Sequence, residues 1–257
     1  MRLNFKKSGE GEPLIILHGL FGSLDNWVTA AKRFSEKFTV YLVDQRNHGH
    51  SPHDEVLNYD AMSSDLEELI SSESRAKVNL IGHSMGGKTA MFYSVYNPDK
   101  VKSLIVVDIS PKYYSVHHKE IIDALFSLDL KNISNRSEAV EQLEIKIPDL
   151  PTRQFLLKNL HWKKSGAKEV FQWRFNLNTI SKNIEKIGEG LPENAIFNGK
   201  TLFLKGENSN YITAEDEEII LHHFPKAKIK VIDGAGHWIH AEKPDEFFDA
   251  VLEFLEK

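Results

Sequence analysis

The chain has 257 residues, of which 41% are hydrophobic and 27% charged, a composition typical of a globular protein with one large domain. Its formal net charge of −5 offers no basic field, so neither nucleic acid nor anionic lipid is an expected partner. The chain has no cysteine, which excludes disulfides, thiolate metal sites and a cysteine nucleophile and suits a reducing compartment. The first apolar run starts at Leu14 and has about five residues, so it indicates a strand rather than a signal peptide. Since no run of about 20 apolar residues exists, we expect a cytoplasmic protein without a membrane span.

Short apolar runs rich in β-formers recur along the chain and predict strands buried on both faces, as in a parallel sheet. They cover residues 13–17, 38–43, 77–82, 101–107, 201–205 and 228–232. Gly9 and Gly11, which precede the first run, suggest a hairpin turn. Helical patterns lie between most of the strands, at residues 58–72, 84–98 and 243–257. This alternation predicts a doubly wound α/β sheet.

The alternation stops between about Ser110 and Gly199. This stretch reads as mainly helical, including TRQFLLKNLHW (152–162), while VFQWRFNL (170–177) suits a short extended piece. The strand pattern resumes at Thr201. We therefore expect residues 1–110 and 199–257 to form an α/β core. Residues 111–198 should form a helical lid over the carboxyl edge of the sheet, where ligands bind in open α/β folds.

The segment LIGHSMGGKT (80–89) matches two motifs that both lie between a strand and a helix. G-x-S-x-G around Ser84 is the nucleophile elbow of serine hydrolases. G-x-x-x-x-G-K-[ST], which includes Lys88, is the phosphate-binding P-loop. LIVVD (104–108) even resembles the strand that holds Mg²⁺ in P-loop enzymes. A P-loop needs a wide turn, whereas an elbow is tight and leaves Lys88 a turn into the helix. These ten residues alone leave both interpretations open.

Two further segments favour the elbow, because a P-loop enzyme has no use for them. LHGLFGS (17–23) follows the first buried strand and is the kind of turn that gives an N–H group to an oxyanion hole. The other N–H comes from Met85, the residue after the nucleophile. GAGHWIHAEKP (234–244) follows the last strand and offers a histidine. We therefore expect Ser84 to be the nucleophile and His237 to be the base that activates it and then protonates the leaving group.

With these motifs and DQRNHGHS (44–51), the chain resembles the α/β-hydrolase family over almost its whole length. RNHG within that segment resembles the YbfF-like subgroup of acyl-ester esterases. The resemblance implies the α/β-hydrolase fold with an inserted lid. It also implies a serine esterase or thioesterase that acts on small carboxylic esters or acyl thioesters through an acyl-enzyme. Water is then the second substrate, and no cofactor is expected.

The resemblance also implies the remaining site residues. Leu20 would give the second oxyanion N–H group, with Phe21 as the alternative. Many relatives carry the acid of the triad after the penultimate strand, but that segment here reads KGENSNYIT and has no aspartate. Glu207 within it is expected to point elsewhere. Asp108, in VVDISP at the end of the preceding strand, is therefore the predicted acid, as in the subgroup.

Other reactions are compatible with the same catalytic residues, and other polar residues have expected roles outside the chemistry. C–C bond hydrolases, perhydrolases and cofactor-free lyases use the same triad, and a P-loop NTPase remains as the remote alternative. Asp44 and Arg46 are expected to brace their loop. No spacing of Asp, Glu and His predicts a metal site. Most histidines should be structural or solvated, with His240 in the first group and His117, His118, His222 and His223 in the second.

Overall fold

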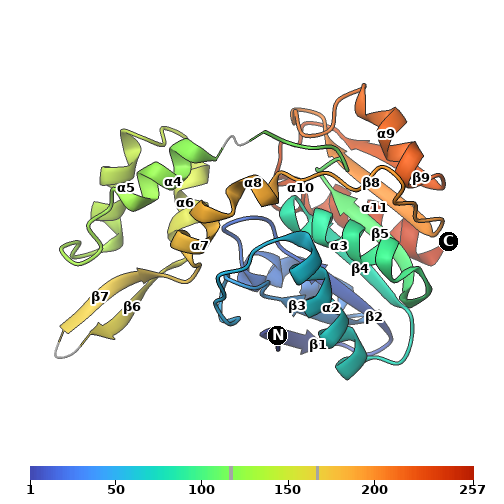
Figure 1. The fold of residues 1–257 in the computed structure, drawn as a ribbon, viewed down its shortest axis with the longest axis horizontal. Coiled ribbons are helices and arrows are strands. Elements are labelled where there is room, and N and C mark those ends of the chain that lie inside the picture. Colours follow the sequence, from blue (N-terminus) through green and yellow to red (C-terminus); the bar gives the residue numbers. More distant parts are fainter. Residues whose placement is uncertain (116–117, 166–167) are drawn as a thin grey trace.

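The computed structural model of the protein describes residues 1–115, 118–165 and 168–257. Within these ranges, seven strands form a sheet in the order β1-β3-β2-β4-β5-β8-β9 (Figure 1). Neighbouring strands are parallel except β1 and β3, which are antiparallel. The predicted α/β class is therefore confirmed. The strands are β1 (Phe5–Ser8), β2 (Glu12–Leu17), β3 (Phe38–Val43), β4 (Val78–His83), β5 (Val101–Val107), β8 (Lys200–Gly206) and β9 (Ala227–Ile232).

Strands β2 to β5 and β8 are mainly apolar because both faces of the sheet are covered by helices, whereas the edge strands β1 and β9 carry exposed lysines. In β2, Ile15 and Leu17 belong to one core, while Leu14 and Ile16 belong to the core on the opposite face. The first face is covered by α2 (Tyr59–Glu73), α3 (Met85–Tyr96) and α9 (Asp216–His223). The second face is covered by α1 (Val28–Phe34), the short α10 (Ile239–Glu242) and α11 (Pro244–Glu256).

The turn at Gly9 and Gly11 does not close a hairpin, which corrects the expectation. Both glycines have positive φ angles, 75° and 127°, so the turn itself exists. Strand β1, however, pairs with β3, with Phe5 opposite Val43. Strand β2 is flanked by β3 and β4 and has no free edge, so the chain reaches the open side of β3 instead.

A long segment separates β5 from β8 and projects from the core (Figure 1). It contains a two-stranded antiparallel sheet in addition to helices, so the run 152–162 is helical only as far as Leu157. Trp162 stacks on Phe171 across this sheet, with ring centroids 3.8 Å apart, and such cross-strand pairs stabilise a hairpin. The elements of the whole inserted segment are α4 (Lys119–Phe126), α5 (Arg136–Glu144), α6 (Leu150–Leu157), β6 (Leu160–Ser165), β7 (Lys168–Trp173), α7 (Leu177–Lys182) and α8 (Ile184–Ile187).

The inserted segment leaves and rejoins the core through two adjacent stretches of backbone, which we call the stems (residues 111–114 and 188–191). The N–H group of Tyr114 donates to the carbonyl of Gly188 at 2.8 Å, and that of Leu191 donates to Pro111 at 2.9 Å. The stems therefore bind each other directly beside the end of β5.

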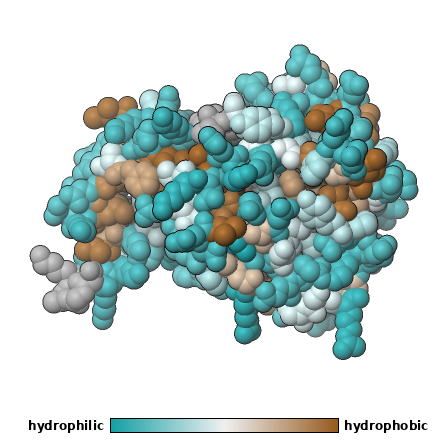
Figure 2. Space-filling model, in the orientation of Figure 1, coloured by the Kyte–Doolittle hydropathy of each residue, from teal (hydrophilic) through white to brown (hydrophobic). Residues whose placement is uncertain are grey.

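The surface is largely hydrophilic, with scattered apolar patches, several of them on the inserted segment (Figure 2). In the described part of the chain, no helix is long and apolar enough to cross a bilayer. The exposed large apolar residues of the inserted segment are Tyr113, Phe126, Ile145, Leu150, Trp162 and Ile196.

Candidate active site

Ser84 occupies a tight turn between β4 and α3. Its backbone is strained, with φ 51° and ψ −119°, and its N–H group donates to the carbonyl of Val107 at 3.0 Å. Only glycine fits at the two flanking positions. A Cβ atom on Gly82 would lie 2.3 Å from the carbonyl oxygen of Gly86, and one on Gly86 would lie 2.5 Å from that of Leu17. This is the geometry of a nucleophile elbow, which presents the serine at the start of a helix.

The position of the Lys88 ammonium group excludes the P-loop interpretation of residues 80–89. Its ammonium group does not reach over the turn. It donates instead to the backbone carbonyls of Lys112 and Glu189 in the two stems, on the side of α3 that faces the inserted segment. The prediction that Lys88 cannot reach a ligand above the loop is therefore confirmed.

Asp108 and His237 are brought together by the ends of two different strands. The Nδ1 atom of His237 lies 2.7 Å from Oδ2 of Asp108. The Asp108 side chain is fully buried, and its carboxylate also accepts the N–H group of Gly206, at 3.1 Å, and the hydroxyl of Ser209. If the imidazole donates from Nδ1 to this carboxylate, Nε2 is left free to accept a proton.

Glu207 does not take part in this contact, as expected. Its carboxylate accepts the N–H group of Gly234 at 2.7 Å, in the turn that precedes His237. Two residues of the same loop that the sequence did not single out lie at the site instead. Ser209 donates to Asp108, and the ring of Tyr211 lies against the ring of His237. A serine and a tyrosine in a polar turn match no motif, and the only hint in the sequence was the missing aspartate.

Backbone N–H groups of Leu20 and Met85 are available for an oxyanion. Neither has a hydrogen-bond partner within residues 1–115, 118–165 and 168–257. Both residues line the same cavity as Ser84, and Met85 is the first residue of α3, where the helix dipole is positive. Phe21 is engaged elsewhere, since its N–H group donates to Nε2 of His48 at 3.2 Å. The geometry thus favours Leu20 over Phe21 as the second donor.

The loop that carries Leu20 and Phe21 is held from two sides. Burial lowers the pKa of His48 to about 3, so its imidazole is neutral and accepts the Phe21 N–H group. On the other side, the buried amide of Asn159 donates to the carbonyl of Phe21 at 2.7 Å. Asn159 belongs to the inserted segment, so this segment contacts the oxyanion loop directly. No local pattern in the sequence predicts this contact.

Two cavities meet at Ser84. The smaller holds about 410 Å³ of empty space and is lined by Leu20 and Met85 of the core and by Tyr114, Ile187 and Gly188 of the inserted segment and its stems. The larger holds about 760 Å³, and His237, Phe21, Phe155 and Trp238 are among the residues that line it. His237 lines the larger cavity and is not among the residues that line the smaller one.

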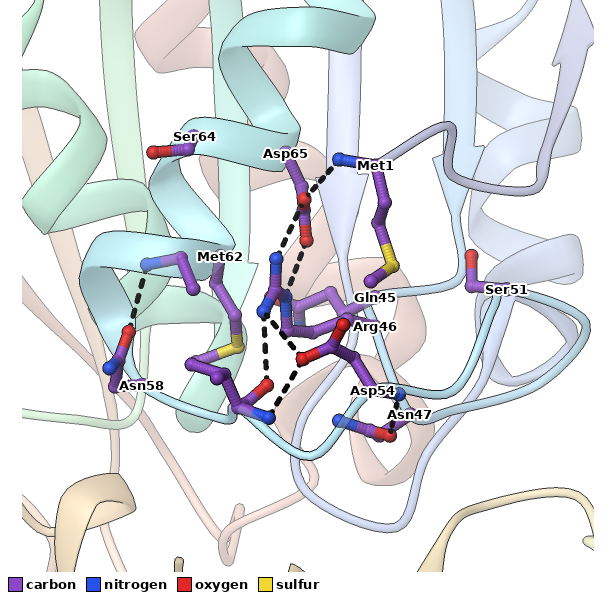
Figure 3. Close-up of polar contacts among 12 residues, drawn as sticks. Met1, Gln45, Arg46, Asn47, Ser51, Asp54, Asn58, Met62, Ser64 and Asp65 are labelled. Carbon is purple, nitrogen blue, oxygen red and sulfur yellow. Dashed lines mark hydrogen bonds and ion pairs between the residues drawn. The ribbon is translucent and has the colours of Figure 1, made fainter. Parts of the chain in front are cut away.

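The loop after β3 is braced by Asp44 and Arg46, as predicted. The Asp44 carboxylate accepts the N–H groups of Leu24, at 2.8 Å, and His50, at 2.9 Å. The Arg46 guanidinium binds both carboxylate oxygens of Asp65, at 2.6 and 2.9 Å, and the amino group of Met1 joins the same carboxylate (Figure 3). Both residues therefore act on the structure of the loop that follows β3.

The remaining histidines differ in part from expectation. His240 stacks on Trp27, with ring centroids 3.8 Å apart, and is structural. His222 is exposed, but His223 is buried against the carbonyl of Ala195, so the prediction for His223 is wrong. His118 lines both cavities, and His117 lies outside the described residues. The described residues contain no group of three or more His, Asp or Glu side chains placed to hold a metal ion.

Comparisons with known proteins agree with the fold described above. The family model of the alpha/beta hydrolase fold matches residues 12–244. The chain is 41% identical to the sn-1-specific diacylglycerol lipase ABHD11 of Danio rerio, over 98% of this chain and 81% of the relative. It is 34% identical to Esterase YbfF of Escherichia coli, over 99% of both chains. A solved structure of a marine microorganism esterase is 48% identical, with a TM-score of 0.95, and covers 98% of this chain and 99% of its own.

Proposed function

This chain belongs to the α/β hydrolase fold family, and we propose that it hydrolyses carboxylic acyl esters with Ser84 as the nucleophile. The observation that carries the proposal is the 2.7 Å contact between Asp108 and His237, formed where the elbow presents Ser84 to the same cavity as His237. A relative named as an esterase and one named as a diacylglycerol lipase make ester bonds the expected target.

The proposed reaction has two halves. Oγ of Ser84 attacks the ester carbonyl carbon while Nε2 of His237 takes the hydroxyl proton. The carbonyl oxygen becomes an oxyanion that the N–H groups of Leu20 and Met85 stabilise. The carbon–oxygen bond to the alcohol then breaks, His237 protonates the alcohol, and the acyl group stays on Ser84. In the second half, His237 takes a proton from water while the water oxygen attacks the acyl carbon. The bond to Oγ of Ser84 then breaks, His237 returns the proton to Oγ, and the acyl group leaves as a carboxylic acid.

The two cavities suggest which part of an ester binds where. The leaving oxygen must lie within reach of Nε2 of His237 to receive its proton. Because His237 lines the larger cavity, we assign the leaving group to that cavity. We therefore assign the acyl chain to the smaller cavity, which lies between the oxyanion donors and the inserted segment. Because this cavity is the smaller of the two and Tyr114, Ile184 and Ile187 line it, we expect it to favour short acyl chains over long ones.

Residues 111–198 are proposed to act as the lid, with residues 1–110 and 199–257 as the core. Ile184, Ile187 and Tyr114 of this segment line the smaller cavity, so the lid would select the acyl chain. An Ile187→Ala variant should accept longer acyl chains. Ile145→Ala is the matched control, because Ile145 lies in the same segment but is 88% exposed. Identical chain-length preferences in both variants would remove the lid as the selector.

The reaction class is tested by covalent labelling. Ser84 should react with a fluorophosphonate probe, and Ser84→Ala should lose both labelling and the hydrolysis of short p-nitrophenyl esters. Acyl-CoA substrates in the same assay separate ester from thioester specificity. A folded wild-type protein that neither reacts with the probe nor hydrolyses any ester would overturn the proposal.

A further inference from the structure

Lys88 is a buried cation whose role the proposed reaction does not explain. The residue lies in the first turn of α3 and is 1% exposed. Its ammonium group donates to the carbonyls of Lys112, at 2.5 Å, Gly188, at 3.4 Å, and Glu189. No carboxylate of the described residues forms an ion pair with it. Three N–H groups therefore meet three backbone carbonyls, which is how a buried ammonium group is satisfied without a counter-ion.

The three carbonyls belong to both stems of the inserted segment. Lys112 lies on the outgoing stem, and Gly188 and Glu189 lie on the returning one. The stems approach so closely that a Cβ atom on Gly188 would lie 2.2 Å from the carbonyl oxygen of Tyr114. The ring of Tyr114 also lies near the ammonium group, with its centroid 4.9 Å from Nζ. Lys88 thus joins the two stems to each other and to α3.

The same helix and the same stems build the site. Helix α3 begins at Met85, one of the two proposed oxyanion donors, directly after Ser84. Tyr114 and Gly188 of the stems line the smaller cavity, together with Ile187 just before the returning stem. A shift of the stems relative to α3 would therefore change the wall of this cavity directly, whereas Ser84, Asp108 and His237 belong to the core and not to the stems.

We propose that Lys88 is a positioning residue that clamps both stems onto α3 and thereby sets the width of the acyl cavity beside Ser84. The proposal rests on the proposed function, because that function assigns the acyl chain to the smaller cavity. The clamp itself is independent of the reaction, and it is measurable in the absence of substrate.

The chemistry of Lys88 indicates which substitution is informative. Burial lowers the pKa of its ammonium group to about 7. The nearby Glu189 opposes this shift by raising the pKa, and Lys112 adds to it by lowering the pKa. Lys112 is itself paired with Asp216 at 2.7 Å, and burial keeps the Tyr114 phenol neutral by raising its pKa. Lys88→Met keeps the length of the side chain and removes a desolvated charge, but it leaves three carbonyls without a donor.

The first measurement is hydrogen exchange of the amides that join the stems, those of Tyr114 and Leu191. In Lys88→Met they should exchange at least about tenfold faster, because the loss of even one of the three hydrogen bonds from a charged donor has an effect of that size. Lys200→Met is the matched control. Lys200 also donates to a backbone carbonyl, that of Phe254, and burial also lowers its pKa, but it lies in β8 far from the stems. Exchange at Tyr114 and Leu191 should be unchanged in this control.

The second measurement is the acyl preference with p-nitrophenyl esters of increasing chain length. In Lys88→Met the KM of the shortest ester should rise and the optimum should move to longer chains, while kcat changes little. Fluorophosphonate labelling of Ser84 should persist, which shows that the fold and the nucleophile are intact. Lys88→Arg, which keeps N–H donors, should restore part of the wild-type preference.

Faster exchange of the Tyr114 and Leu191 amides, together with an acyl preference that moves to longer chains, supports the proposal. Unchanged exchange in a folded Lys88→Met variant would overturn the clamp. Faster exchange with an unchanged acyl preference would overturn its role in specificity. If the wild-type protein hydrolysed no ester, the proposed function would fail, but the exchange experiment would still decide whether Lys88 holds the stems.

Discussion

The phenol ring of Tyr211 lies flat on the imidazole of His237, with ring centroids 4.0 Å apart and planes inclined by 19°. The backbone of Tyr211 is itself anchored, because its N–H group donates to Oγ of Ser209 and its carbonyl accepts the hydroxyl of Tyr114. Burial raises the pKa of Tyr211 to about 12, so the ring that faces the imidazole is neutral. The loop after β8 therefore orients both the histidine and its acid.

Tyr211→Leu should reduce kcat by up to about tenfold, because a stacked aromatic pair contributes about 0.5–1.5 kcal/mol. Tyr211→Phe keeps the ring and should retain most of the activity. Steady-state kinetics of both variants on one short p-nitrophenyl ester separate the contribution of the ring from that of the hydroxyl. An equal loss in both variants would assign the effect to the hydroxyl and not to the stack.

Asp108→Asn should lower kcat by about 10⁴, because the amide stabilises the wrong tautomer of the histidine. This corresponds to roughly 5 kcal/mol of activation free energy. Glu207→Gln is the control, since the carboxylate of Glu207 accepts the N–H group of Gly234 in the turn that precedes His237. Both variants should fold normally by circular dichroism. Asn210→Asp in the Asp108→Asn background should restore part of the rate by supplying an acid from the loop after β8.

The acid assignment would be wrong if Asp108→Asn kept near-normal esterase activity and Glu207→Gln did not. The roles proposed for Ser84 and His237 would survive that result, because they depend on the elbow and on the cavity that both residues line.

Ser209→Ala should reduce kcat by about tenfold, since a hydrogen bond to a charged group contributes about 1.5–3 kcal/mol and this one is buried. The carboxylate of Asp108 would keep the Gly206 N–H group and His237 as partners, so the loss should be far smaller than in Asp108→Asn. Ser64→Ala is a suitable control, because its hydroxyl donates to the carbonyl of Asp60 on the exposed side of α2. Equal rates for Ser209→Ala and the wild type would remove Ser209 from the site.

The stability of the protein should fall at acid pH through His48. Its pKa is about 3 in the fold, against about 6.5 for an ordinary histidine, so the unfolded chain binds more protons between these values. The free energy of unfolding should therefore decrease as pH falls below about 6.5, and at pH 5 the loss from this residue is about 2 kcal/mol. Urea denaturation at pH 7.5 and pH 5 measures the loss. His48→Gln should show a smaller difference between the two pH values than the wild type does, and an equal difference would contradict the assignment.

The parts of the fold and site that the sequence predicts are those with a local signature. Strands β2 to β5 are continuous apolar runs because both of their faces are buried, and such runs stand out against amphipathic helices. Ser84 and His237 lie in glycine-flanked turns whose shape restricts the residue types around them. The residues around Leu20 carry the same kind of signal.

The parts that the sequence does not predict depend on contacts between distant segments. Asn159 reaches Phe21 across 138 positions, and Ser209 reaches Asp108 across 101, so neither contact leaves a local pattern. Strand β6 follows α6 after only two residues, and its pairing with β7 overrides the helical appearance of residues 158–162. The hairpin expected at Gly9 failed for the same reason, because the partner of β1 is decided by which sheet edge is free.

The contact between the two stems makes the inserted segment an exchangeable module. A segment whose ends lie side by side can be replaced by recombination at residues 111–114 and 188–191 without rethreading any strand of the sheet. If the inserted segment selects the acyl chain as proposed, a graft from a relative would bring its own acyl preference while Ser84, Asp108 and His237 stay unchanged. Its junction would have to match this core, with small residues at Gly188 and Gly190 and backbone carbonyls placed to meet Lys88.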